Sequence, residues 1–189
     1  DQIGIFGNNT NDIALLLEVL SGADEYDSTA LNDENPVFTN KAIPTRRYRI
    51  AYFKEALQHP LLDNGIREQV FALIDLLKNK GHLIEEVDFN LLEYVVPAYY
   101  VLTTAEASSN LSRYDGIRYG YQTKNDIQDL NDFYKKTRSE GFGKEVQRRI
   151  MLGTYTLSSG YYDAYYNKAL KVRRLIKNDF DQAFAQCDV

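Results

Sequence analysis

The chain has 189 residues, of which 44% are hydrophobic and 26% charged, and its 22 bases and 27 acids give a formal net charge of −5. This composition is typical of a globular domain and excludes wholesale disorder. No stretch approaches the roughly 18 consecutive apolar residues of a membrane helix, so we expect no membrane partner. The only cysteine, Cys187, and two distant histidines argue against a metal site. A lone cysteine also favours a reducing compartment, the cytoplasm.

The first ninety residues predict a mixture of helix and strand. Apolar residues recur with a helical period in two segments, each preceded by a capping Asn, Asp or Thr and followed by Gly. Two shorter segments alternate like strands, and they flank the second helix as in a βαβ unit with parallel strands. The expected elements are a helix at 11–21, a polar connection at 23–46, a strand at 48–53, a helix from Asp63 or Asn64 to Gly81, and a strand at 82–89.

After residue 90 the pattern becomes almost wholly helical. We predict a helix at 91–112 entered near Pro97, a loop rich in Gly and Tyr at 114–121, a helix at 126–139, and a helical period over 144–186 with possible breaks at Gly153 and Gly160. The fold class is therefore α/β, with a mostly helical second part. We expect one domain over 1–189, with an α/β part at 1–90 and a helical part at 91–189.

Few residues suggest catalytic chemistry on their own. The serine pairs Ser108-Ser109 and Ser158-Ser159 lack a glycine-rich elbow and a neighbouring base, so helix packing explains them better than nucleophilic catalysis. The best candidate for ligand binding is the pair Arg148-Arg149, because a guanidinium matches a carboxylate or phosphate with two parallel hydrogen bonds. Adjacent helical positions point about 100° apart, so at most one of the two faces a given pocket.

The basic residues cluster along the chain. Residues 134–177 hold eleven bases and three acids, a pattern that a helical RNA-binding module would show. The solvated faces of long helices show it too, and the overall acidity, with an isoelectric point near 5.1, argues against a dedicated nucleic-acid surface.

Several blocks of sequence, spread over essentially the whole chain, resemble one family. The blocks are Asp1-Gln2-Ile3-Gly4, Asp27-Ser28-Thr29, Pro97-Ala98-Tyr99-Tyr100, the stretch from Glu106 to Gly120, Thr137-Arg138-Ser139-Glu140-Gly141-Phe142-Gly143, Arg148-Arg149-Ile150-Met151-Leu152-Gly153 and Gly160-Tyr161-Tyr162-Asp163-Ala164-Tyr165-Tyr166. They are similar to the A subunits of the aspartyl/glutamyl-tRNA amidotransferases, which belong to the amidase-signature family. That family implies a mixed β-sheet flanked by helices.

The resemblance implies a glutaminase that releases ammonia for the conversion of Glu-tRNA(Gln) or Asp-tRNA(Asn) into Gln-tRNA or Asn-tRNA. It implies a cytoplasmic heterotrimer, in which a B subunit uses ATP and Mg to activate the mischarged tRNA, a C subunit braces the pair, and the A subunit needs no cofactor. The family's Ser-Ser-Lys triad lies upstream of the Asp-Gln-Ile-Gly block. We therefore expect no catalytic residue in this chain, and no activity from the chain alone.

The resemblance also implies which residues meet the substrate. An Arg of the Arg-Arg-Ile block would hold the glutamine carboxylate, and Arg149 matches that position better than Arg148. A Tyr of the Ala-Tyr-Tyr block would line the pocket, and we assign this role to Tyr99. The alternative function is a stand-alone amidase of the same family that acts on another amide.

Overall fold

The computed structural model describes residues 3–30, 37–39 and 46–189. These residues form two compact units, one ending at Tyr48 and one spanning Arg49–Val189. Parts of the predicted connection at 23–46 therefore lie outside the described residues. The predicted single domain, with an α/β part at 1–90 and a helical part at 91–189, stays a prediction. The strands and the later helices lie together in the second unit.

The first unit is built on helix α1 (Thr10–Leu20). It begins where expected because the Asn9 side chain accepts a hydrogen bond of 2.9 Å from the backbone N–H of Asp12, which caps the helix. Towards its end, Glu18 accepts hydrogen bonds from the backbone N–H and the hydroxyl of Thr39, at 2.6 and 2.8 Å. This carboxylate ties the helix to the segment that follows it in the unit.

The second unit opens with the predicted βαβ arrangement. Strand β1 (Arg49–Phe53) pairs in parallel with β2 (Leu83–Val87), in a register that sets Arg49 opposite Leu83. Between them lie a short helix, α2 (Lys54–Gln58), and α3 (Asn64–Asn79), which Asp63 caps by accepting from the N–H of Ile66 at 3.1 Å. The predicted strand–helix–strand order and the parallel pairing are confirmed.

The C-terminal residues extend this small sheet on its other side. Val189 donates its N–H to the carbonyl of Arg49 at 3.2 Å and accepts from the N–H of Ala51 at 2.8 Å, the pattern of a parallel pair. The Asp188 carboxylate also accepts from the N–H of Arg49, at 2.8 Å. Strand β1 therefore has hydrogen-bonded neighbours on both edges.

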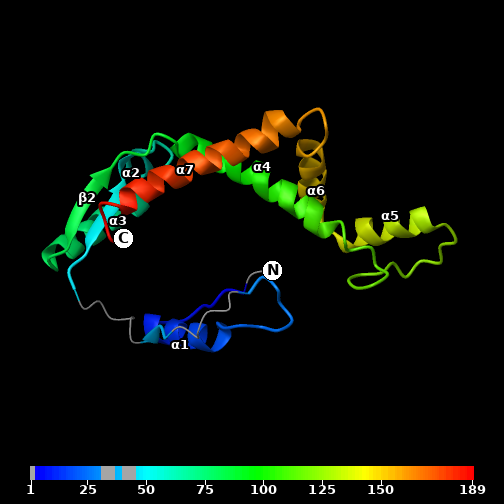
Figure 1. Ribbon diagram of the computed structural model, residues 1–189, viewed down its shortest axis with the longest axis horizontal. Helices are drawn as coiled ribbons and strands as arrows, with labels where there is room; N and C mark the ends of the chain where they lie inside the picture. Colours follow the sequence, from blue (N-terminus) through cyan, green and yellow to red (C-terminus); the bar gives the residue numbers. More distant parts are fainter. Residues whose placement is uncertain (1–2, 31–36, 40–45) are drawn as a thin grey trace. The chain divides into compact units, whose positions relative to one another are not determined.

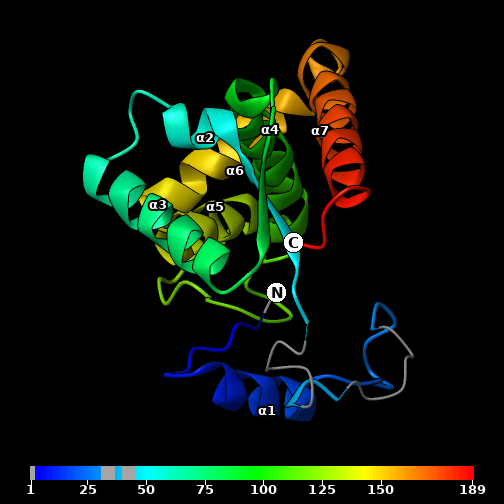
Figure 2. The same ribbon diagram turned by 90° about the vertical axis from the view of Figure 1, so that its left-hand side faces the viewer.

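The remaining elements are helical. They are α4 (Leu92–Leu111), α5 (Leu130–Gly141), α6 (Lys144–Thr156), the π-helix η2 (Tyr162–Asn167) and α7 (Lys168–Phe184). Helices α4 and α7 run side by side, as Figures 1 and 2 show, and α4 packs most extensively against α6. Pro97 is the sixth residue of α4 rather than its entrance, so the helix continues past a residue that has no N–H for the ladder.

Most boundaries agree with the sequence prediction to within two residues, but the start of α5 and the expected break at Gly153 do not. Helix α5 begins at Leu130 rather than 126, because Asp129 has an extended backbone and its side chain accepts from the N–H of Asn131 at 3.3 Å. Gly153 was expected as a possible break but lies inside α6. The interruption instead falls between Thr156 and Tyr162, next to Gly160.

An aromatic cluster joins the sheet to α7. Phe53, Phe89 and Phe180 meet with ring centroids 4.6, 5.0 and 5.8 Å apart. Phe89 is almost fully buried, and its N–H donates to the Glu55 carboxylate at 2.7 Å. This cluster fixes α7 on the βαβ part, and α7 in turn packs on α4, which carries the candidate site.

Candidate functional site

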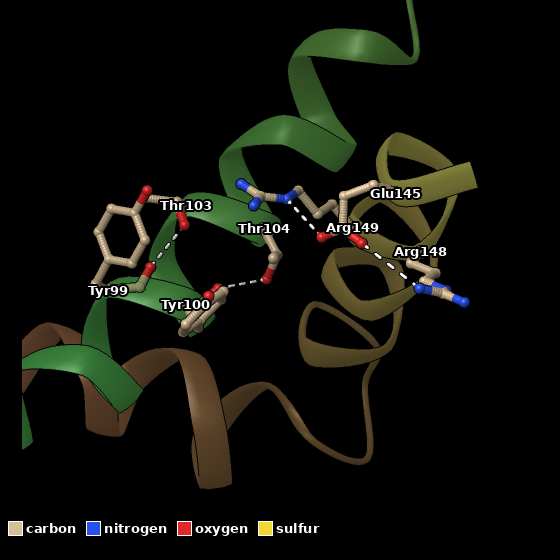
Figure 3. A network of polar contacts seen from close by, with 7 residues as sticks. All are labelled: Tyr99, Tyr100, Thr103, Thr104, Glu145, Arg148 and Arg149. Carbon is tan, nitrogen blue, oxygen red and sulfur yellow. Dashed lines mark hydrogen bonds and ion pairs between the residues drawn. The ribbon is translucent and has the colours of Figure 1, made fainter. Parts of the chain in front are cut away.

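The two arginines of the Arg-Arg-Ile block point in different directions from α6. The Arg149 side chain is 40% exposed and lies on the face of α6 turned towards α4, whereas the Arg148 side chain is 78% exposed and points away from α4 (Figure 3). The angular step between adjacent helical residues produces this difference. Of the two guanidinium groups, Arg149 is therefore the one directed towards the tyrosines of α4.

Glu145 orients both arginines from one turn earlier in α6. Its carboxylate accepts a hydrogen bond of 3.2 Å from Nε of Arg149, and its other oxygen lies 3.7 Å from Nη1 of Arg148. In Figure 3 the terminal nitrogens of Arg149 are directed away from Glu145. A guanidinium has five N–H donors, so a hydrogen bond at Nε leaves the edge formed by the two terminal nitrogens suitable for a carboxylate.

The tyrosines of α4 complete the surroundings of Arg149. Tyr99 and Tyr100 are both about half exposed, and their rings meet edge to face with centroids 5.5 Å apart. The hydrogen bond to Glu145 raises the pKa of Arg149 above its usual value, and smaller contributions from Tyr99 and Tyr100 act in the same direction. The structure thus brings Arg149 and Tyr99 into one neighbourhood and shows Tyr100 as a further member that the sequence did not single out.

The two helices cross at very short range one turn after Arg149. Gly153, one turn after Arg149, is buried against the backbone of Thr104, one turn after Tyr100. The Thr104 hydroxyl turns inward along its own helix and donates to the carbonyl of Tyr100 at 2.6 Å. A glycine in this position reads as a helix breaker in the sequence, so the crossing could not be found from the pattern alone.

One serine of each pair makes a structural hydrogen bond. The hydroxyls of Ser108 and Thr154 lie 2.9 Å apart and join α4 to α6, while Ser158 donates to the carbonyl of Tyr155 at 2.7 Å. Neither arrangement places a serine beside a general base.

The described residues 3–30, 37–39 and 46–189 offer neither a metal site nor a membrane-spanning helix. No group of three or more His, Cys, Asp and Glu side chains there could hold a metal ion. None of the helices in that part of the chain is both long and apolar enough to cross a membrane.

The loop that precedes α5 is folded against that helix. The Tyr121 hydroxyl donates to Glu140 at 2.9 Å, and the side-chain amide of Asn125 donates to the other oxygen of this carboxylate at 2.8 Å. Arg138 reaches back from α5 and donates to the carbonyls of Leu111 and Tyr114 at 2.9 and 3.0 Å. The Gly- and Tyr-rich loop is therefore an ordered structure tied to the end of α4.

Comparison with known proteins identifies the family. The sequence profile of the Amidase family matches residues 1–189. The chain belongs to the Amidase family. Similar amidases include the A subunits of the glutamyl-tRNA(Gln) amidotransferases of Agathobacter rectalis (50% identical), Caldanaerobacter subterraneus (51%) and Staphylococcus aureus (49%), and each match covers 100% of this chain. The chain spans only 37–39% of the length of these relatives.

A solved structure agrees with this assignment. The crystal structure of the A subunit of glutamyl-tRNA(Gln) amidotransferase from Thermotoga maritima aligns with 95% of this chain and 34% of its own, at a TM-score of 0.61 and 33% sequence identity. The mostly helical amidase chain with its parallel strand pair thus has the fold of the corresponding part of that protein. The expected fold class is confirmed.

Proposed function

We propose that this chain is a segment of the A subunit of a glutamyl-tRNA(Gln) amidotransferase and that it supplies the carboxylate-binding part of the glutamine site. The whole protein would hydrolyse glutamine and release ammonia, which serves to convert Glu-tRNA(Gln) or Asp-tRNA(Asn) into the amidated form. Its partners would be the B and C subunits, with ATP and Mg used by the B subunit, while the protein itself needs no cofactor or metal. The catalytic serines and lysine would lie outside this chain.

The orientation of Arg149 is the observation that supports this role for the chain. The guanidinium is directed towards α4, is held at Nε by Glu145, and stands beside Tyr99 and Tyr100. An arginine fixed at one nitrogen and open along its terminal edge is suited to the planar carboxylate of an amino acid. Tyr99 and Tyr100 offer phenolic hydroxyls and apolar ring faces to the rest of the ligand.

The decisive experiment compares Arg149→Ala with Arg148→Ala in the full-length protein, assembled with its partners. We expect Arg149→Ala to lower kcat/KM for glutamine-dependent ammonia release roughly 100-fold, because the carboxylate contact is lost, and Arg148→Ala to change it less than about threefold. For glutamine α-amide, which lacks the carboxylate, we expect kcat/KM to be similar in Arg149→Ala and in the wild type. Equal kinetics for glutamine in Arg149→Ala and wild type would refute the assignment.

The same assay addresses the alternative amidase. If the wild-type complex hydrolyses simple amides but releases no ammonia from glutamine, the chain belongs to a stand-alone amidase that acts on another amide. A loss caused by Arg148→Ala and not by Arg149→Ala would move the carboxylate site to the other arginine.

A further inference from the structure

Helices α4 and α6 approach each other very closely at Gly153. A Cβ atom built on Gly153 would stand 2.0 Å from the carbonyl oxygen of Thr104, 2.6 Å from its carbonyl carbon and 2.7 Å from Cβ of Ser108. Ordinary van der Waals contact begins at 3.4 Å. Two of these three atoms belong to the backbone of α4, so no rotation of a side chain can make room. The present distance between the helices exists only because residue 153 has no Cβ.

The crossing is also buried and held by a hydrogen bond between the helices. Thr104 is 1% exposed, and Thr156, at the far end of α6, is buried too and donates its hydroxyl to the carbonyl of Gly153 at 3.0 Å. The hydrogen-bonded pair of Ser108 and Thr154 lies beside the same contact. The Thr156 bond lies within α6, and the bond between Ser108 and Thr154 joins the two helices, so close backbone packing and one cross-helix hydrogen bond hold α6 against α4.

This crossing lies one helical turn from the candidate site on both helices. Arg149 precedes Gly153 by four residues, and Tyr100 precedes Thr104 by four, so each pair shares a face of its helix. Because α6 carries Arg149 and α4 carries Tyr99 and Tyr100, a change in the separation of the helices at the contact changes the position of the guanidinium relative to the tyrosines. An added methyl group would have to move α6 by about 1.4 Å to restore ordinary contact, the difference between 3.4 and 2.0 Å.

We propose that Gly153 is a positioning residue for Arg149: its lack of a side chain sets the distance between α6 and α4 and thereby the place of the guanidinium beside the tyrosines. The inference rests on the proposed function, since it concerns the same carboxylate site. Gly153 touches no substrate and acts only through the helix that carries Arg149. A mutation far from the reacting groups that misplaces a residue by about 1 Å can lower the rate on the order of 100-fold. We therefore expect a large effect on glutamine hydrolysis.

The test is Gly153→Ala in the full-length protein, assembled with its partners. The matched control is Gly143→Ala, at the start of the same helix, where an added Cβ meets nothing within 4 Å and the backbone φ of −62° suits any residue. We expect Gly153→Ala to lower kcat/KM for glutamine roughly 30- to 100-fold, with the control within about twofold of wild type. Amidation supported by ammonium chloride, which bypasses glutamine, should stay unchanged in both variants.

A double-mutant cycle separates positioning from general damage. If Gly153 acts through Arg149, then Gly153→Ala should have almost no further effect on kcat/KM once Arg149→Ala is present. The ratio of kcat/KM for glutamine to that for glutamine α-amide should fall in Gly153→Ala, as it does when the carboxylate contact is removed. Three results would overturn the inference: losses in kcat/KM that multiply in the double variant, an unchanged ratio of kcat/KM for glutamine to that for glutamine α-amide, or an equal loss of amidation supported by ammonium chloride.

A milder variant covers the case in which Gly153→Ala does not assemble. Ser108→Ala removes the 2.9 Å bond to Thr154 at the same crossing without adding bulk. A loss of several-fold that disappears in the Arg149→Ala background would support the inference, and a loss that multiplies, or no loss, would overturn it. If Arg149→Ala itself leaves glutamine kinetics unchanged, the proposed function of the site fails, whereas an effect of Arg149→Ala without one from Gly153→Ala refutes the positioning role alone.

Discussion

Arg138 offers the sharpest test of how the loop before α5 is held. Its Nη1 donates to the carbonyls of Leu111 and Tyr114 at 2.9 and 3.0 Å, and its guanidinium carbon lies 5.0 Å from the centre of the Phe142 ring. Leu111 is the last residue of α4, so its carbonyl has no partner within the helix and attracts a cation. We expect Arg138→Ala to release the segment 112–125 from α5 without unfolding α4.

The size of the effect follows from these contacts. A hydrogen bond to a charged group contributes about 1.5–3 kcal/mol and a cation–π contact about 0.5–1 kcal/mol. Water can replace the lost donors once the loop opens, so we take about 2–4 kcal/mol for the whole set. Since 1.4 kcal/mol corresponds to a factor of ten, backbone amides in 112–125 should exchange roughly 30- to 700-fold faster.

Hydrogen exchange followed by mass spectrometry measures this directly. The amide of Thr123, which donates to the Thr137 hydroxyl at 3.2 Å, reports on the docked loop. The control is Arg113→Ala, because among the contacts that the structure describes that guanidinium bonds only to Asn110, near the end of α4. Exchange in 112–125 that stays at the wild-type rate in Arg138→Ala, or that rises equally throughout α4, would refute the reasoning.

Two further predictions concern the aromatic clusters. Phe89→Ala should lower the free energy of unfolding by about 3–5 kcal/mol in urea titrations, because the side chain is 3% exposed and stacks on Phe53. The control Phe184→Ala, at 57% exposure, should lower it by less than about 1 kcal/mol. Equal losses in the two variants would contradict this account of the core. A hydrogen bond with Tyr161, burial and a hydrogen bond with Tyr165 raise the pKa of Tyr155 to about 12 from 10.0. A raised pKa means that the protonated phenol contributes its stabilisation fully below pH 10 and loses it as the pH rises through 12. In an ultraviolet titration, Tyr155→Phe should therefore reduce the tyrosine absorbance change that appears near pH 12.

The parts of the fold with local signals could be predicted from the sequence. Asp63 and Gly81 delimit α3 because capping and the left-handed backbone of Gly81, with φ of 86°, are properties of the residues themselves. The two strands and their parallel pairing followed from the order of elements. These features depend on a few neighbouring residues, so a single sequence carries them.

Contacts between distant segments could not be predicted in the same way. Gly153 looks like a helix break, but its role depends on Thr104, which lies 49 positions earlier in the chain and which no local pattern connects with it. The sequence showed that only one of Arg148 and Arg149 could face a pocket, and the packing of α6 on α4 determines that Arg149 faces α4. The site thus depended on a helix–helix contact that only the structure reveals.

The pairing of the C-terminal residues with β1 has a consequence for how the second unit folds. The bond between Arg49 and Asp188 joins residues 139 positions apart, so the two ends of this unit meet. Closing a flexible loop of that length costs on the order of 4 kcal/mol in chain entropy, more than one such hydrogen bond returns. We therefore expect this contact to form late in folding, after the intervening helices have packed and shortened the path between the ends. Asp188 and Val189 then join helices and strands that have already packed, and β1 gains its second neighbour only at that stage.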